Sequence, residues 1–182
     1  MLTEPLPLNR IDAGQLFDYL YGFFHRDFIA CKTHLASKIL IDPQSDRKED
    51  GKECSFWHLT TREQSRQIKN KVTGRYENVR ERLPDFSRSE RIEWVKKIIE
   101  NHDHEDILCF YHQESTGKKP IRFYMWADKD SFVVILQKLG NSRSFLVTSF
   151  YIDHDDKHKD YQHRYERYIS GQAQELLGCE WF

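Results

Sequence analysis

Four strand-like segments follow one another between Ile107 and Ile152, and the stretches between them are short and turn-like. The segments read ILCFYH (107–112), IRFYMW (121–126), SFVVILQK (131–138) and SFLVTSFYI (144–152), and the connections contain STGKK, ADKD and LGNSR. Short connections join antiparallel neighbours, because a parallel pair needs a crossover of a dozen or more residues. The sequence therefore predicts a four-stranded antiparallel meander.

An amphipathic helix is predicted immediately before these strands, in RSERIEWVKKIIEN (88–101). Ser87 is the expected N-cap, with Glu90 at the capping-box position. At about 100° per residue, Arg91 falls near the middle of the apolar face. That face is formed by Ile92, Trp94, Val95, Ile98 and Ile99. A guanidinium on this face is either a functional group, a partner of a buried acid, or a side chain whose charged end reaches solvent past the end of the helix.

The rest of the chain is expected to add helices to this unit. Helical spacing of apolar residues predicts a helix over 11–28 and a final helix over 159–177, while 35–41 fits a short helix or strand. The polar run 42–53 is expected to be an exposed loop, and Thr60 or Thr61 could cap a basic surface helix. We expect an α+β fold in which a helix precedes the meander, residues 1–82 form a helical extension, and residues 83–182 form the core with a C-terminal helix, all in one compact domain.

Charge is unevenly distributed in a chain whose total is close to neutral, with 28 basic and 29 acidic residues. Eleven Lys or Arg stand against six acids between Arg62 and Lys97, whereas acids gather in HDHED (102–106) and DHDDKHKD (153–160). This pattern fits a solvated, salt-bridged helix face, or alternatively a phosphate-binding surface.

Several classes of protein are not indicated. The four cysteines form no Cys-x-x-Cys pair, so we expect them to be reduced thiols. No long apolar run suggests a membrane span, and the first residues lack a secretory apolar region. We therefore expect a cytoplasmic protein with no membrane partner. Phosphate-binding glycine loops and the G-x-S-x-G elbow are also missing from the sequence.

The segment from about Leu83 to Ile152 resembles the phage-associated branch of the barnase, EndoU, colicin and RelE nucleases, the BECR superfamily. RIEW (91–94), IRFYMW, FVVILQ and LVTSFYI (146–152) carry the resemblance. It implies metal-independent RNA cleavage, often as a toxin with an antitoxin or immunity protein. The sequence departs from barnase in offering Thr148, Ser149 and Tyr151 where a terminal-strand histidine would be expected.

Cleavage of RNA without a metal requires a base for the 2′-hydroxyl, a cation for the phosphorane and an acid for the departing 5′-oxygen. Arg91 and Arg122 are expected to converge on one phosphate, because a guanidinium stays charged and can bind two phosphate oxygens. Alternation in IRFYMW places Ile121, Phe123 and Met125 on one face of the strand and Arg122, Tyr124 and Trp126 on the other.

The candidate catalytic residues are Arg91, Arg122, Tyr124 and Thr148, and the candidate RNA contacts are Arg88, Lys119, Trp126 and Tyr151. Each has an ordinary alternative, such as an ion pair, a strand position or a covered sheet face. His102, His104 and His112 could supply an acid or base, and either the pair His102 and His104 or the set His154, His158 and His163 could bind a metal. Histidines in solvated polar loops are the better explanation of all of them.

We therefore expect an endoribonuclease that needs no metal or cofactor and remains active in the presence of a chelator. The alternatives are a noncatalytic nucleic-acid-binding or phage accessory module on the same scaffold, and a small-molecule site in the concavity of the sheet.

Overall fold

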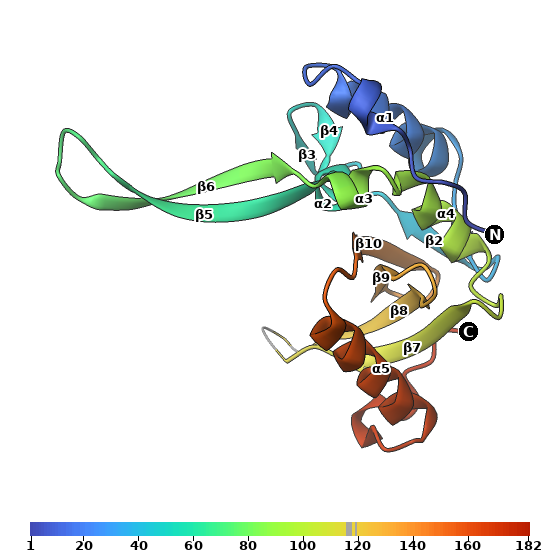
Figure 1. Cartoon of the computed structure of the whole chain (residues 1–182). Coiled ribbons are helices and arrows are strands. Elements are labelled where there is room, and N and C mark those ends of the chain that lie inside the picture. Colours follow the sequence, from blue (N-terminus) through green and yellow to red (C-terminus); the bar gives the residue numbers. More distant parts are fainter. Residues whose placement is uncertain (116–117, 119) are drawn as a thin grey trace.

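A computed structural model describes residues 1–115, 118 and 120–182, and for Arg80 the backbone only. Its largest sheet has six strands in the order β1-β2-β10-β9-β8-β7 (Figure 1). The strands are β1 (His34–Leu35), β2 (Ile39–Asp42), β7 (Ile107–Gln113), β8 (Ile121–Ala127), β9 (Phe132–Leu139) and β10 (Arg143–Tyr151). The α+β class is confirmed, and the sheet is curled.

The N-terminal part of the chain contributes strands to this sheet as well as helices. β7, β8, β9 and β10 pair antiparallel in chain order, but β2 then pairs parallel with β10, with Leu40 opposite Arg143. The expected four-stranded unit therefore does not describe the whole sheet. β2 has only four residues, and nothing in its sequence indicates which strand it pairs with.

One face of the sheet packs against α4 (Ile92–Glu100), which in turn contacts α1 (Leu16–Phe24). The five predicted apolar residues of α4 are all buried, and they share a core with Phe123 and Met125 of β8. The helix expected over 11–28 is shorter than predicted, because α1 is followed by a π-helical segment, His25–Ala30. The N-cap before α4 also differs from the expected Ser87: Asp85 caps a separate short helix, α3 (Phe86–Ser89).

The other face of the sheet is covered by α5 (Asp155–Ile169), the predicted C-terminal helix. α5 begins and ends earlier than expected, and a short 3-10 turn, Gln174–Leu176, follows it. Tyr161 of α5 is 4 % exposed and lies against the rings of Phe110, Tyr124 and Trp126. The alternation predicted for β8 is therefore correct, and both faces of that strand are buried.

The expected basic helix after Thr60 is instead a long β-hairpin, formed by β5 (Thr61–Lys69) and β6 (Tyr76–Pro84), which we call the arm. It projects away from the rest of the molecule (Figure 1). The hydroxyls of Thr60 and Thr61 donate to the carbonyls of Phe56 and Trp57, so they close the end of α2 (Cys54–Thr60) instead of beginning a new helix. At the far end, the side chain of Asn70 accepts from the backbone of the turn, and Gly74 has a φ of +70°.

The expected loop over 42–53 contains a second, short hairpin, β3 (Lys48–Glu49) and β4 (Lys52–Glu53). Asp50 and Gly51, at its tip, have φ values of 49° and 76°, as a two-residue primed turn requires. No helix among the described residues combines the length and the apolar character needed to cross a membrane.

Candidate functional site

A polar pocket of about 270 Å³ lies where the arm joins the body, and we call it the arm-base pocket. Its lining residues come from α2, β5, β6 and α3: His58, Thr61, Arg62, Glu63, Arg82 and Arg88. Three guanidinium groups and one imidazole in so small a space form an arrangement suited to an anion.

Arg88, a predicted RNA contact, connects this pocket to the sheet. Its Nη1 donates to the carbonyl of His58 at 3.1 Å and to Oγ1 of Thr148 at 3.3 Å. Oγ1 of Thr148 in turn donates to the same carbonyl at 3.2 Å. Two of the residues selected from the sequence, Arg88 and Thr148, are therefore in direct contact.

Arg62 and Arg88 share a single buried carboxylate. Oδ2 of Asp85 lies 3.1 Å from Arg62 Nη2 and 3.1 Å from Arg88 Nε, and Oδ1 accepts from the backbone of Arg88 as the cap of α3. Burial, followed in importance by the field of Arg62, lowers the pKa of Arg88, although an arginine remains charged at neutral pH.

One guanidinium nitrogen in this pocket lacks an acceptor. Arg82 is paired through Nη2 with Glu49 at 3.0 Å and Glu63 at 3.6 Å. Within the part of the chain that the structure describes, Arg82 Nη1 is buried without a hydrogen-bond acceptor, whereas Arg88 Nε has the Asp85 carboxylate as its ion-pair partner. A buried unpaired donor is costly, so an acceptor supplied by a ligand would stabilise it.

His58 adds a proton acceptor to this cationic pocket. Its pKa is lowered chiefly by burial and then by the positive charges of Arg82 and Arg88. The lowered pKa keeps the imidazole neutral at pH 7, which is the state a general base needs.

The neighbouring wall is formed by β10 and α5. β10 is irregular between Leu146 and Thr148, an interruption in pairing of the kind often found beside functional sites. Nζ of Lys157 lies 3.9 Å from the ring centroid of Phe150, and the guanidinium of Arg88 lies 5.7 Å from the same centroid. Burial lowers the pKa of Lys157, and the charges of Arg88 and Arg62 lower it further.

Arg91 lies elsewhere, at the start of α4. It pairs with Glu90, donates to the carbonyl of Ser87 at 2.9 Å, and stacks over Tyr151 with 4.5 Å to the ring centroid. Tyr151, a predicted RNA contact, packs against the same core as α4.

Arg122 and Tyr124 share a different acid, Glu114. Arg122 Nη1 lies 3.3 Å from Glu114 Oε1, and the hydroxyl of Tyr124 donates to the same oxygen at 2.5 Å. Tyr124 is 2 % exposed, and burial together with this hydrogen bond raises its pKa far above the usual value for tyrosine.

The expected convergence of Arg91 and Arg122 on one phosphate is not found. Tyr151, beneath Arg91, is aligned through Phe132 with Ala127 at the end of β8, whereas Arg122 is near its beginning. Five residues of strand correspond to about 17 Å. The two arginines also lie on opposite faces of the sheet, since the residues around them belong to different cores, and each has its own carboxylate.

Trp126 is fully buried beneath α5, against His158 and Tyr161, so in this structure its ring is not accessible for stacking on a base. Alternation along the strand identified its face correctly but could not show which element covers it. Lys119 lies outside the described residues.

A second polar pocket, of about 440 Å³, lies near Arg122, between β7 and α5. It contains His112 and His163, but the arginines around it each have a separate acid: Arg122 with Glu114, Arg164 with Asp160, and Arg167 with Glu175. The arm-base pocket differs in that Arg62 and Arg88 share one carboxylate, that of Asp85, while Arg82 is paired with Glu49 and Glu63.

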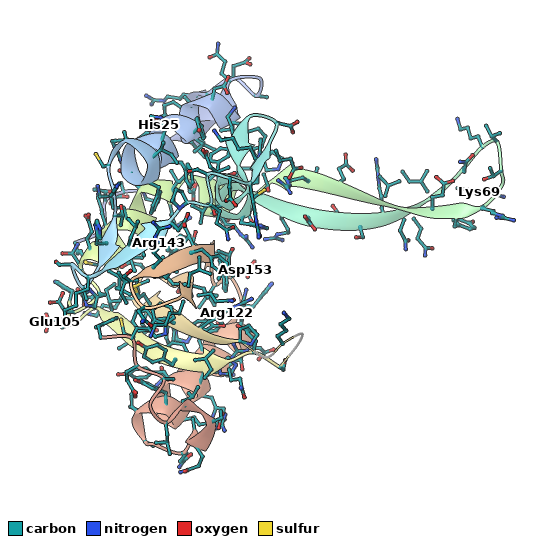
Figure 2. The ribbon with its side chains drawn as sticks, turned by 180° about the vertical axis from the view of Figure 1, so that it is seen from behind. His25, Lys69, Glu105, Arg122, Arg143 and Asp153 are labelled. Carbon is teal, nitrogen blue, oxygen red and sulfur yellow. The ribbon has the colours of Figure 1, made fainter. Side chains whose placement is uncertain are left out.

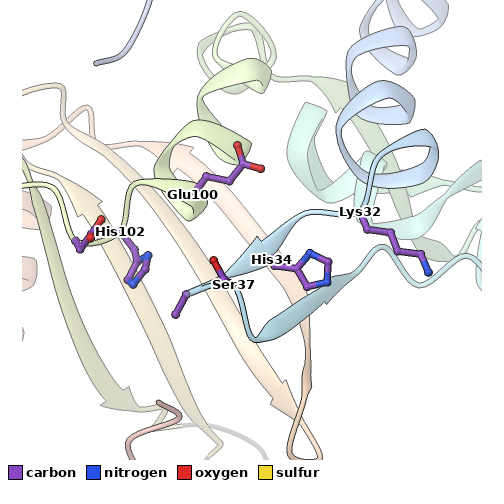
Figure 3. Close-up of a pocket in the computed structure, with 7 residues that line it drawn as sticks. Lys32, His34, Ser37, Glu100 and His102 are labelled. Carbon is purple, nitrogen blue, oxygen red and sulfur yellow. The ribbon is translucent and has the colours of Figure 1, made fainter.

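A third pocket, of about 730 Å³, is open and polar, and includes His34 of β1 and His102 after α4. Figure 3 shows the two imidazoles on either side of Ser37. Among residues 1–115, 118 and 120–182, no group of three or more His, Cys, Asp or Glu is arranged to hold a metal ion.

The residues that sequence reasoning missed are His58 and Lys157. Arg62 and Arg82 belong to the basic segment 62–97 but were assigned no individual role, and His58 was not among the candidate residues. The contacts that mark it, to Arg88 and Thr148, come from residues 30 and 90 positions away.

No family model, curated protein or solved structure matches this chain.

Proposed function

We propose that this protein is a metal-independent endoribonuclease, with its active site at the arm-base pocket. The observation that carries the proposal is a neutral imidazole beside three arginines, one of which, Arg82, has a buried guanidinium nitrogen with no acceptor among the described residues. This combination supplies two of the three requirements for cleavage by the 2′-hydroxyl, namely a base and a preformed cationic site for the phosphorane.

In this reaction, His58 takes the proton from the 2′-hydroxyl, and the resulting oxygen attacks the adjacent phosphorus. Arg62, Arg82 and Arg88 stabilise the additional negative charge on the phosphorane, and loss of one such donor typically reduces the rate by about 10²–10³-fold. Breakage of the bond from phosphorus to the 5′-oxygen leaves a 2′,3′-cyclic phosphate.

Lys157 is our candidate for the acid that protonates the departing 5′-oxygen. Its lowered pKa makes the ammonium group a better proton donor than an ordinary lysine. Lys157 and Arg88 both lie over the ring of Phe150, so Lys157 is next to an arginine that lines the pocket.

The test uses purified protein and mixed single-stranded and structured RNA, with and without EDTA. We expect cleavage in both conditions, with products ending in cyclic phosphate. RNA that stays intact, or cleavage that disappears with EDTA, would contradict the proposal.

We also propose a toxin-type role for this activity. Induced expression should then arrest growth, and Arg88→Gln should relieve the arrest while the protein accumulates to the same level. An antitoxin or immunity protein would be expected to block the arm-base pocket.

The second candidate function is noncatalytic nucleic-acid binding, which the charge and exposure of the arm favour. Binding that persists without any cleavage would select it.

A further inference from the structure

The arm is an extended element that contributes almost nothing to the core. β5 and β6 pair over all nine residues of each strand, and each β5 residue after Thr61 is exposed. Nine residues at about 3.3–3.4 Å give a length of about 30 Å. Figure 2 shows Lys69 near the far end, well away from the body. An isolated two-stranded hairpin is marginally stable in water, so packing within the chain does not explain the arm.

The arm carries a formal positive charge that the rest of the chain does not. Residues 61–84 contain seven Lys or Arg and three Glu, a net charge of +4, so the remaining 21 basic and 26 acidic residues sum to −5. Residues 64–76, which include most of β5 and the turn, contain four cations and no acid, whereas β6 brings Glu77 opposite Ile68 and Glu81 opposite Gln64. The four cations are Arg66, Lys69, Lys71 and Arg75.

These cations continue directly from the arm-base pocket. Arg62 and Arg82 line the pocket at the base of the hairpin. Arg66 is four residues beyond Arg62 and on the same face of β5, and Lys69 pairs with Tyr76 at the end of the ladder. The ion pair of Arg66 with Glu81, at 3.3 Å, joins two exposed side chains and therefore holds Arg66 only weakly.

The end of the arm also presents apolar groups. Tyr76 is 69 % exposed and Val72 is 95 % exposed. An exposed aromatic ring beside cations is the combination that binds single-stranded nucleic acid, because the ring stacks on a base while the cations contact phosphate.

We propose that the arm binds the backbone of the same RNA strand whose scissile phosphate occupies the arm-base pocket. The inference rests on the proposed function, and it specifies the substrate class: RNA that extends several nucleotides beyond the cleavage site, because the arm is about 30 Å long. RNA is favoured over an acidic protein partner because the cations are distributed along the length of the arm and an exposed aromatic ring, Tyr76, lies near its end.

The test measures binding separately from cleavage. Fluorescence anisotropy would be recorded with 2′-O-methyl RNA of 5 and 20 nucleotides, which lacks the attacking hydroxyl, over a range of salt concentrations. The arm variant replaces Arg66, Lys69, Lys71 and Arg75 with Gln. The control variant makes the same change in charge at four exposed cations of the body, Arg10, Lys32, Lys38 and Lys159.

For wild type and the control, we expect the 20-mer to bind at least about tenfold more tightly than the 5-mer. For the arm variant, that difference should disappear, and the slope of log K against log salt for the 20-mer should fall by about 3, as expected for four lost contacts with a single strand. Cleavage of an unmodified 5-mer should be unchanged in the arm variant.

Equal binding of the 20-mer by the arm variant and wild type would overturn the inference and point to a protein partner for the arm. Absence of cleavage by wild type, together with arm-dependent binding, would instead overturn the nuclease proposal and support the arm as an RNA-binding element. A matched DNA 20-mer that binds as tightly as RNA would overturn the restriction to RNA.

Discussion

Replacing His58 with Ala is the most direct test of the proposed chemistry. The imidazole is the proposed base, whereas the hydrogen bonds that hold this residue in the fold involve its backbone. The hydrogen bonds that connect His58 to Arg88 and Thr148 are accepted by its backbone carbonyl. Alanine keeps that carbonyl, so the junction of α2, α3 and β10 should persist. The substitution therefore removes the proposed base and little else.

The expected magnitudes differ strongly between activity and stability. General base catalysis typically contributes about 10²–10⁴-fold, which corresponds to about 3–5 kcal/mol in the activation barrier. The free energy of unfolding should change by less than about 0.5 kcal/mol, as is usual for a substitution outside the core. The control is His154→Ala, whose side chain is 78 % exposed at the start of α5.

The assay is single-turnover cleavage of a fluorescent RNA at saturating protein, with urea unfolding of each variant recorded in parallel. A loss of rate of 10²-fold or more in His58→Ala, with unchanged unfolding and a normal rate for His154→Ala, is the expected result. Cleavage by His58→Ala within threefold of wild type would refute the assignment of the base.

Two further predictions concern the pH profile and the core. Arg82→Gln should move the acidic limb of the kcat/KM profile to higher pH, because the lost positive charge no longer disfavours the imidazolium of His58. Glu63→Gln should move the same limb to lower pH, because the lost negative charge no longer favours the imidazolium. Shifts in the same direction for both variants would contradict the electrostatic explanation. Tyr161→Ala should lower the free energy of unfolding in urea by about 3–4 kcal/mol, since burial of an aromatic ring is lost. The control, Tyr161→Phe, should lower it by less than about 1 kcal/mol. A decrease under about 1 kcal/mol in the Ala variant would mean that α5 does not bury this face of the sheet.

Local sequence patterns predicted correctly the elements whose structure depends mainly on residues within the same segment. Alternating residues identified β7 to β10, and the apolar face of α4 was correct in all five positions, because each pattern is repeated several times within one element. The expectation that Thr60 or Thr61 caps a basic helix was wrong, because a β-strand follows. The same hydroxyl that could begin a helix donates here to the carbonyl of Phe56 and ends one.

The predicted site was only partly assembled by the fold. Arg88 and Thr148 meet, but Arg91 and Arg122 are held by Glu90 and Glu114 at different ends of the sheet. The sequence does not show whether an arginine is paired with a nearby acid or is available to a ligand. Glu90 is adjacent to Arg91, and Glu114 is eight residues from Arg122.

The sequence by itself determined the α+β class, the strands after residue 107, and the concentration of positive charge between residues 62 and 97. Only the tertiary structure decided that α5 buries Trp126, that β2 joins β10, and that His58 lies among arginines from three other elements. The physical reason is the range of the interactions: periodicity and charge are properties of neighbouring residues, whereas a site depends on contacts between residues that are distant along the chain, and these are fixed only when the whole core packs.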